Sequence, residues 1–277
     1  MKKAFTLAEV LITLAIIGVV AALTIPTLVV NYQKKVTMTK LKKEYNYINN
    51  AFRAYMATEG VNDMKDTTLW KLMPSSGVMG DTITPHDFAG SENSAFRNEL
   101  NKIFRIADVT TIGNPPVNYE VKVKRMNGED EVPMFPGVII LQDGTILYTE
   151  FFTRPNRAYC NSGNCTSLEQ FQKERQTPTR LWEDIAHILI APNGFKENIV
   201  MGKDLFDYRL GSNGIIYPKA GIDDAVYSGC SYSGDMSKCS QYWKNEGSPF
   251  YSCVNTSNIA GHGCIARIME EGWEMNY

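Results

Sequence analysis

The chain begins with an apolar run that passes directly into an amphipathic pattern. Val10 to Val30 is 21 residues without a charge, and about 20 apolar residues suffice to cross a bilayer as a helix. Beyond this run, apolar side chains recur every three or four positions, as on one helix face: Met38, Leu41, Tyr45, Ile48, Phe52 and Tyr55. Gly60 is a typical helix stop. The pattern predicts one helix over residues 6–58, about 80 Å long.

A cleavable secretory signal is the alternative for this region, with Ala21 and Ala22 as the small residues before a cut. Two features count against it. Glu9 interrupts the passage from basic to apolar residues, and the apolar run exceeds the ~7–15 residues of a signal sequence. Cleavage would also divide one continuous helical pattern. A retained membrane helix is therefore the favoured interpretation.

The rest of the chain carries strand and turn patterns. Residues 117–125 alternate between apolar and polar, which predicts a half-buried antiparallel strand. Residues 138–151 predict a hairpin with a two-residue turn at Asp143-Gly144, and residues 205–218 predict a second hairpin around Ser212-Asn213-Gly214. Residues 184–192 fit a strand or a short helix.

Two short helices are also predicted, over residues 94–107 and 264–272. Residues 61–92 and 153–181 have the polar, Gly- and Pro-containing sequence typical of connections. A long helix followed by a small antiparallel sheet gives an α+β fold. We expect the apolar half of the helix to lie in a membrane, and the amphipathic half to pack on a sheet head with disulfide-braced loops.

Charge is unevenly distributed along the chain. Residues 1–59 carry eight Lys or Arg and three Asp or Glu, a net of +5, whereas the remainder carries 20 and 27, a net of −7. Nucleic-acid binding needs clustered cations, so the acidic body argues against a nucleic-acid partner. Lysines also flank the apolar run, two before it and five at residues 34–43. Taken alone, this asymmetry would place the body in the cytoplasm.

Six cysteines lie in the later half of the chain, in segments rich in Gly, Ser and Asn. This arrangement favours disulfides and an oxidising compartment, and therefore a body outside the cytoplasm. Pairing by proximity gives Cys160–Cys165, Cys230–Cys239 and Cys253–Cys264, one of many possible connectivities. The alternative is a zinc ion shared by Cys253, His262 and Cys264, although paired C-x₂-C spacing is absent.

No set of catalytic residues stands out. The sequence has three histidines and lacks a Gly-x-Ser-x-Gly elbow, an HExxH helix and a phosphate-binding loop. His187 lies in an apolar run, which predicts a hydrogen-bonded core residue. His262 lies among glycines, which predicts an exposed side chain. The chain is therefore interpreted as a non-enzymatic protein.

The amino-terminal residues closely resemble those of type IV pilins and type II secretion pseudopilins. The match comprises Lys2-Lys3-Ala4, then Phe5-Thr6-Leu7-Ala8-Glu9, then the apolar run. The resemblance implies that a prepilin peptidase removes a leader at residues 1–4 and methylates the new terminus at Phe5. The family's usual Gly before the cut is Ala4 here. The implied organisation continues with a transmembrane and assembly helix at 5–59 and a globular pilin-like head at 60–277.

The resemblance implies roles for two helix residues. In family filaments the carboxylate at the position of Glu9 lies near the amino terminus of an adjacent subunit's helix. The resemblance would therefore make Glu9 the assembly carboxylate. A paired charge is tolerable in apolar surroundings where a lone charge is not. The alternative is a solvated Glu9 in the headgroup zone. Pro26 lacks the donor for its helical hydrogen bond, which predicts a local bend or a melted turn.

Partners and location follow from the same resemblance. The implied partners are a prepilin peptidase, other pilin or pseudopilin subunits and an inner-membrane assembly platform. The implied location is the inner membrane, in a single pass, with the head on the periplasmic or extracellular side, and a filament after assembly. Together with the cysteines, this outweighs the lysine asymmetry.

A segment of the head, residues 189–210, resembles one common in pseudopilin-like chains. Oxygen ligands in such a Gly-bent loop can hold Ca²⁺, and the candidates here are Asn193, Asn198 and Asp204. Ala191 stands where the pattern's first Asp would be, which weakens the calcium interpretation. The alternative is a structural turn capped by Asn and Asp side chains. No other cofactor is predicted.

The combined prediction is a structural subunit of a type IV pilus-like or type II secretion pseudopilus filament. Two alternatives stay open. A minor tip pilin with an adhesive or DNA-uptake role is favoured by the head of more than 200 residues, although its acidity counts against DNA. A membrane-tethered enzyme would need a nucleophile and base that the sequence does not display.

Overall fold

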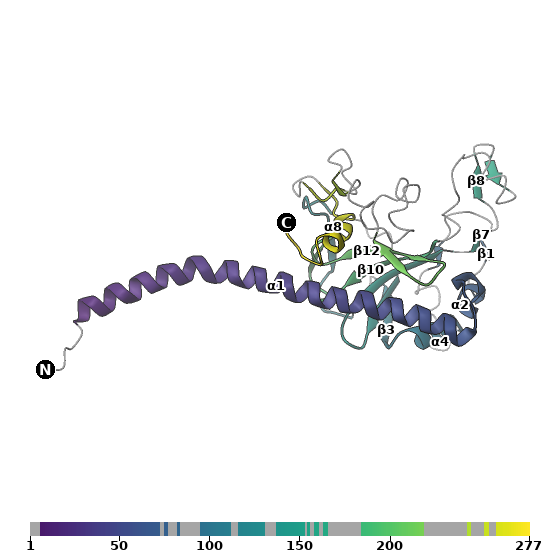
Figure 1. The fold of residues 1–277 in the computed structure, drawn as a ribbon, viewed down its shortest axis with the longest axis horizontal. Coiled ribbons are helices and arrows are strands. Elements are labelled where there is room, and N and C mark those ends of the chain that lie inside the picture. The colour runs from purple at the N-terminus through teal and green to yellow at the C-terminus, as the bar shows by residue number, and fades with distance from the viewer. Residues whose placement is uncertain are drawn as a thin grey trace.

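The computed structural model describes most of the chain (Figure 1). The described residues are 6–72, 75–76, 82–83, 95–111, 116–130, 137–152, 154–155, 158–160, 163–165, 184–218, 243–244, 252–254 and 259–277. They form a long helix and an antiparallel β head, the α+β fold predicted from the pattern. In Figure 1 the first half of the helix projects away from the head, and the second half lies along it.

The stem is a single helix, α1 (Leu7–Glu59), of 53 residues, and both ends lie within one residue of the prediction. It ends at Gly60, whose φ of 69° is a left-handed conformation that favours glycine. The predicted stripe is confirmed. Its buried members, each 4 % exposed or less, are Met38, Leu41, Ile48, Phe52 and Tyr55.

Beyond the stem the chain turns back over the end of the core. A 3₁₀ turn, η1 (Met64–Asp66), leads into the short helix α2 (Thr68–Leu72). Met64, Leu69 and Trp70 are buried. The predicted surface connection over residues 61–92 is therefore wrong for its first part, because these few apolar residues close the core without forming a periodic pattern.

The helix predicted over residues 94–107 is shorter than expected. It is α4 (Ala95–Ile103), and the chain then enters a strand, β3 (Ile106–Thr111). The strand was not predicted, although Val109, Thr110 and Thr111 are β-branched residues that favour one. Apolar residues at the end of α4 continue the helical spacing into the strand, which hid the boundary.

The head is built on one antiparallel sheet of seven strands. Its order is β13-β12-β10-β6-β5-β3, and β2 also pairs with β6. The bounds are β2 (Thr82–Ile83), β5 (Gly137–Leu141), β6 (Ile146–Phe152), β10 (Asp184–Ala191), β12 (Phe206–Gly211) and β13 (Ile216–Pro218). Both predicted hairpins are confirmed, as β5–β6 and β12–β13. Of the two alternatives for residues 184–192, the strand is correct, and it lies inside the sheet.

The loop of the first hairpin differs from the predicted two-residue turn. The Leu141 N–H donates to Thr145 O at 2.9 Å, and the Gly144 N–H donates to Leu141 O at 3.0 Å. The loop therefore has three residues, and Gly144 adopts a φ of 86°, as is usual in three-residue hairpins. This geometry places Asp143 in the loop that faces the stem.

Three two-stranded pairs complete the described part of the head. They are β1 (Ser75–Ser76) with β7 (Arg154–Pro155), β4 (Lys122–Lys124) with β11 (Asn198–Val200), and β8 (Ala158–Cys160) with β9 (Gly163–Cys165). The antiparallel strand predicted over residues 117–125 is wrong. Only β4 forms within it, and β4 pairs in parallel, because its partner comes from far along the chain rather than from a hairpin.

The two faces of the sheet bury different side chains. Ile188 and Ile190 of β10 point toward α1 and belong to the main core, whereas Leu189 belongs to a second cluster on the opposite face. This follows from the period of two along a strand. The last helix, α8 (Cys264–Glu270), covers part of the head and buries Ile265 and Ile268, as predicted.

Phe52→Ala tests the packing of stem on head. Phe52 is fully buried, and its ring meets that of Phe104 edge-on at 5.2 Å between centroids. Loss of a buried aromatic ring costs about 3–5 kcal/mol. We expect the free energy of unfolding of the full chain in detergent micelles to fall by that amount in urea titrations. Asn46→Ala, on the exposed side of α1, is the control. Equal losses in both variants would contradict the packing.

Candidate functional site: the stem and its contact with the head

The stem begins with a reciprocal pair between Thr6 and Glu9. Glu9 Oε2 accepts hydrogen bonds from the Thr6 backbone N–H and hydroxyl, both at 2.8 Å, and the Glu9 N–H donates back to the hydroxyl. This is a capping box, whose Thr-x-x-Glu spacing was readable in the sequence. The Glu9 carboxylate therefore has partners within its own chain. Ala4 and Phe5, the predicted processing residues, lie outside the described residues.

The amino-terminal half of α1 exposes its apolar side chains. From Leu7 to Val30 the large apolar residues range from 42 % exposed at Val10 to 78 % at Leu7. By length and composition α1 can cross a membrane, and none of the residues in its most apolar stretch is buried. Contiguous apolar surface of this extent marks a contact with lipid or with protein.

α1 continues through Pro26 without interruption. The proline ring supplies no N–H, so the carbonyl of Ala22 loses its helical donor. Figure 1 shows the apolar half of α1 as a gentle curve. The structure contains no melted turn at this position, and the helix is continuous there.

Lys43 links the stem to the β5–β6 loop. Its Nζ lies 2.9 Å from Asp143 Oδ2 and 3.0 Å from Glu44 Oε1. The Glu44 side chain is 3 % exposed, and burial raises its pKa. Burial would also raise the pKa of Asp143, but hydrogen bonds from Lys43 and from the Thr145 N–H outweigh it and lower that pKa to about 2.

Hydrogen bonds from side chains fix the position of the stem along the head. Asn49 Oδ1 accepts from the Ile216 N–H at 2.8 Å, and the Tyr55 hydroxyl donates to Glu99 at 2.8 Å. Because these groups are buried, a shift of the helix would leave them without partners at a cost of about 1–3 kcal/mol each. The register of stem on head is therefore specified.

The end of the chain packs on the stem near the apolar half. Trp273 has a φ of 70°, rare for a residue with a side chain, and its ring lies 5.2 Å from that of Tyr45 and 5.9 Å from Lys42 Nζ. Lys34 Nζ donates to the main-chain oxygen of Tyr277 at 2.6 Å. These contacts mark the place where the stem leaves the head.

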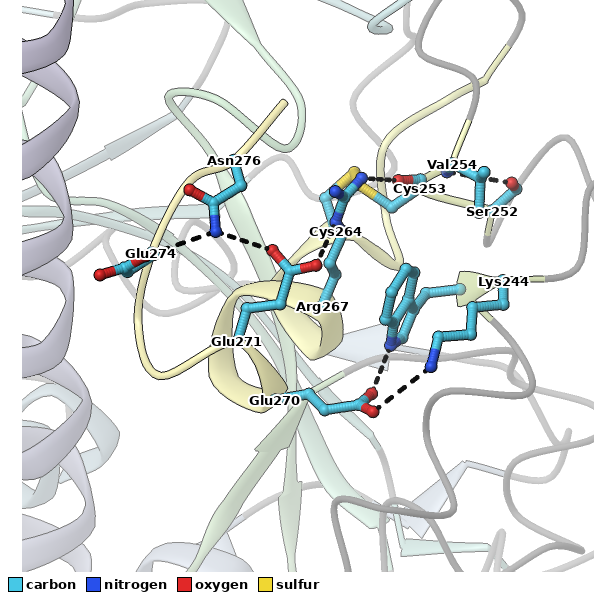
Figure 2. A network of polar contacts seen from close by, with 11 residues as sticks. Lys244, Ser252, Cys253, Val254, Cys264, Arg267, Glu270, Glu271, Glu274 and Asn276 are labelled. Atoms are coloured by element: carbon cyan, nitrogen blue, oxygen red, sulfur yellow. Dashed lines mark hydrogen bonds and ion pairs between the residues drawn. A yellow bond between two sulfur atoms is a disulfide. The ribbon is translucent and has the colours of Figure 1, made fainter.

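The disulfide predicted between Cys253 and Cys264 is present. Both sulfurs are bonded to each other, so the zinc alternative for these residues is wrong. Figure 2 shows the disulfide at the start of α8, where Arg267 donates to Cys253 O at 2.6 Å and to Glu271 at 3.0 Å. The bond and this network hold the chain before α8 against the helix.

The other two predicted disulfides stay predictions. Cys160 and Cys165 lie on the paired strands β8 and β9, where Cys160 is opposite Gly163 and Cys165 is opposite Ala158. Cys230 and Cys239 lie outside the described residues.

His187 and His262, two of the three histidines of the chain, are buried in the head. His187, on β10, is 2 % exposed, which confirms the predicted core position. His262 is 5 % exposed, with Nδ1 2.7 Å from Asp207 Oδ2, so the predicted exposed side chain is wrong. The glycine-rich loop passes so close to the head that a Cβ on Gly261 would lie 2.6 Å from Met201 O. Glycine here marks close packing rather than a free loop.

Two of the three candidate calcium ligands, Asn193 and Asp204, have side-chain partners in the fold. Asn193 Nδ2 donates to Thr37 Oγ1 of the stem at 2.8 Å. The Asp204 carboxylate accepts from Lys196 Nζ and from the Val200 N–H, and Asn198 is exposed on β11. Among the described residues, no group of three or more His, Cys, Asp or Glu could hold a metal ion. These contacts fit the structural turn, and calcium binding stays a prediction.

Comparison with known families identifies the type of amino-terminal segment. Residues 1–25 match the model of the prokaryotic N-terminal methylation motif. The chain carries a prepilin-type amino terminus. No curated protein and no solved structure matches the chain significantly.

The prepilin-type segment supports a type IV pilin-like or pseudopilin precursor and points to a structural protein rather than an enzyme. It implies processing by prepilin peptidase and assembly with other pilin subunits. Together with the apolar half of α1, it is consistent with an inner-membrane anchor.

Asp143→Asn should weaken the contact of stem and head in a pH-dependent manner. The folded-state pKa of about 2 lies below the ordinary 3.8, so the charge stabilises the fold above pH 3.8, and this stabilisation is lost as the pH falls toward 2. We expect the variant to lower the free energy of unfolding by about 1 kcal/mol at pH 7 and by little near pH 2.

Urea titrations of the full chain in micelles at the two pH values measure the difference. Glu120→Gln is the control, because the Glu120 side chain is 76 % exposed in its pair with Lys122. The same loss for Asp143→Asn at both pH values would contradict the assignment of the Lys43–Asp143 pair.

Proposed function

We propose that the chain is a structural subunit of a type IV pilus-like or type II secretion pseudopilus filament. In this proposal, prepilin peptidase cuts between Ala4 and Phe5, and the subunit resides in the inner membrane with its head outside the cytoplasm. An assembly platform then transfers it into the filament. The observation that carries the proposal is the exposed apolar half of α1 directly behind a prepilin-type leader.

The apolar half of α1 has two successive environments in this proposal, the bilayer and the filament. Lipid surrounds the apolar residues before assembly, and neighbouring stems surround them afterwards. Burial of apolar surface is favourable in both places. The head stays at a fixed height along the stem, because Asn49 and Lys43 specify the register. Stem packing therefore determines where each head lies in the filament.

Glu9 has a partner in each state. In the single chain its carboxylate accepts from Thr6, and a cut before Phe5 leaves both of these donors in place. In the filament, the amino group of a neighbouring Phe5 adds a charged donor. Charge-assisted hydrogen bonds are about twice as strong as neutral ones. A subunit that enters the filament with Glu9 paired to the neighbouring Phe5 amino group is therefore favoured over a subunit that enters without this pair.

The mature amino terminus tests the processing step. Full-length chain produced together with a prepilin peptidase should begin at N-methyl-Phe5, as measured by mass spectrometry of the intact protein and of its first peptide. Ala4→Gly restores the residue that is usual in the family and serves as the matched control, expected to be cut at the same bond. A start near Leu23, or a retained Met1, would refute the proposal.

Glu9→Gln tests the assembly carboxylate. The substitution keeps the size of the side chain and removes its charge, so membrane insertion should persist while filament formation is abolished or misordered. Breaking a buried ion pair costs about 3–5 kcal/mol. Membrane fractionation and electron microscopy of sheared filaments measure the two outcomes.

Thr13→Val is the control in the same apolar segment. The Thr13 hydroxyl donates to Val10 O within its own helix, so its loss should leave assembly unchanged. Normal filaments from Glu9→Gln would show that Glu9 is not the assembly carboxylate.

A further inference from the structure

A dense group of lysines follows the apolar run of the stem. We call it the basic collar, and its members are Lys34, Lys35, Lys40, Lys42 and Lys43. Residues 31–43 contain no Asp or Glu, and the first acidic residue after them is Glu44. The Glu44 side chain is buried and lies beside Lys43. The collar is therefore a strongly positive stretch of helix at the point where the stem leaves the head.

The members of the collar differ in their contacts. Lys43 pairs with Asp143, and Lys34 donates to Tyr277 O. The side chains of Lys35 and Lys40 are exposed and make no hydrogen bond or ion pair with the described part of the chain. Stability of the fold explains Lys34 and Lys43. It leaves Lys35 and Lys40 unexplained.

The position of these lysines along the helix matches that of a bilayer surface. With the residues up to Val30 in the hydrocarbon, Lys35 lies about 8 Å and Lys40 about 15 Å beyond it, at about 1.5 Å per residue. The headgroup layer on each side of a bilayer is roughly 5–8 Å thick. Lys35 is thus level with the headgroups, and Lys40 lies within about a Debye length of them.

An aromatic residue marks the same level. Tyr32 is 67 % exposed and follows the last apolar residue by two positions. Tyr is enriched at membrane–water interfaces, where its apolar ring and polar hydroxyl each find a suitable environment. Tyr32 and Lys35 together form the arrangement expected of a stem segment that lies among lipid headgroups.

We propose that the basic collar binds the anionic phospholipid headgroups of the leaflet that faces the head. Lysines on this flank run against the usual bias toward the cytoplasmic side, and headgroup binding gives them a function. Each lysine near an anionic membrane surface strengthens binding about fivefold. The proposal rests on membrane insertion of α1 as given under Proposed function, and it adds the lipid class that the inserted subunit recognises.

In this proposal the basic collar adds an electrostatic attraction to the hydrophobic one that keeps the subunit in the bilayer. A subunit that leaves the bilayer must release headgroups from Lys35 and Lys40 as well as lipid tails from the apolar run. The first of these terms is screened by salt, and the second is not. Retention of the subunit therefore depends on the anionic lipid content of the membrane.

Chemical labelling of lysines in nanodiscs tests the contact. The full-length chain is placed in nanodiscs of phosphatidylcholine alone and of phosphatidylcholine with phosphatidylglycerol, and acetylation rates are measured by mass spectrometry. We expect Lys35 and Lys40 to react several-fold more slowly in the anionic nanodiscs, with the difference removed at high salt. Lys65 and Lys122 of the head are internal controls and should react equally in both.

Matched double variants test the dependence on charge. K35Q/K40Q should lower the number of phosphatidylglycerol molecules retained in neutral detergent, with affinity reduced about 25-fold from the loss of two lysines. K35R/K40R keeps the charge and should bind as the unmodified chain does. K65Q/K122Q removes the same charge from the head and should have no effect.

The outcomes separate this inference from the proposed function. Failure of the chain to enter either kind of nanodisc overturns both. Entry into both with equal labelling of Lys35 and Lys40 overturns the headgroup inference alone. Protection of these lysines only when a second copy of the chain is present would assign the collar to an acidic neighbouring head instead, and would also overturn it.

Discussion

Burial of one face of α1 against the sheet is the contact on which the rest of the molecule depends. Leu41, Ile48 and Phe52 are fully buried in it, and each such side chain contributes about 1.5–3 kcal/mol. The same contact leaves the apolar half of the helix with no partner from the described part of the head. Buried polar groups such as Asn49 then fix the register, so the apolar half begins at a defined distance from the head.

The sequence predicted those parts of the fold that local patterns determine. The period of α1 and its stop at Gly60 are local, and so are the two hairpins. The pairing of β4 with β11 is not local, because residues 122–124 meet residues 198–200. Alternation along a strand shows that one face is buried, but it does not reveal the partner or its direction. For this reason the strand over residues 117–125 was predicted to be antiparallel, whereas β4 pairs with β11 in parallel.

The candidate site was predictable to a different degree at each residue. The leader and Glu9 form a contiguous segment, so they were recognised directly, and Thr6 could have been added from the same four residues. The pair of Lys43 and Asp143 depends on a three-residue loop that local sequence does not distinguish from a shorter one. In the candidate calcium loop the residue types were suitable, but Lys196 occupies the carboxylate of Asp204, which only the folded arrangement reveals.

The continuity of α1 has a mechanical consequence. The helix is unbroken from its cap at Thr6 to its cap at Gly60, and Pro26 is the proline within it. A force along the axis of the apolar half passes to the head through the backbone hydrogen bonds of α1, because no flexible linker interrupts the helix. Sideways bending is easier at Pro26, because the proline removes one hydrogen bond of the helix. A displacement of the apolar half along its axis is therefore transmitted directly to the head, and Pro26 marks a point of easier bending between the two ends of α1.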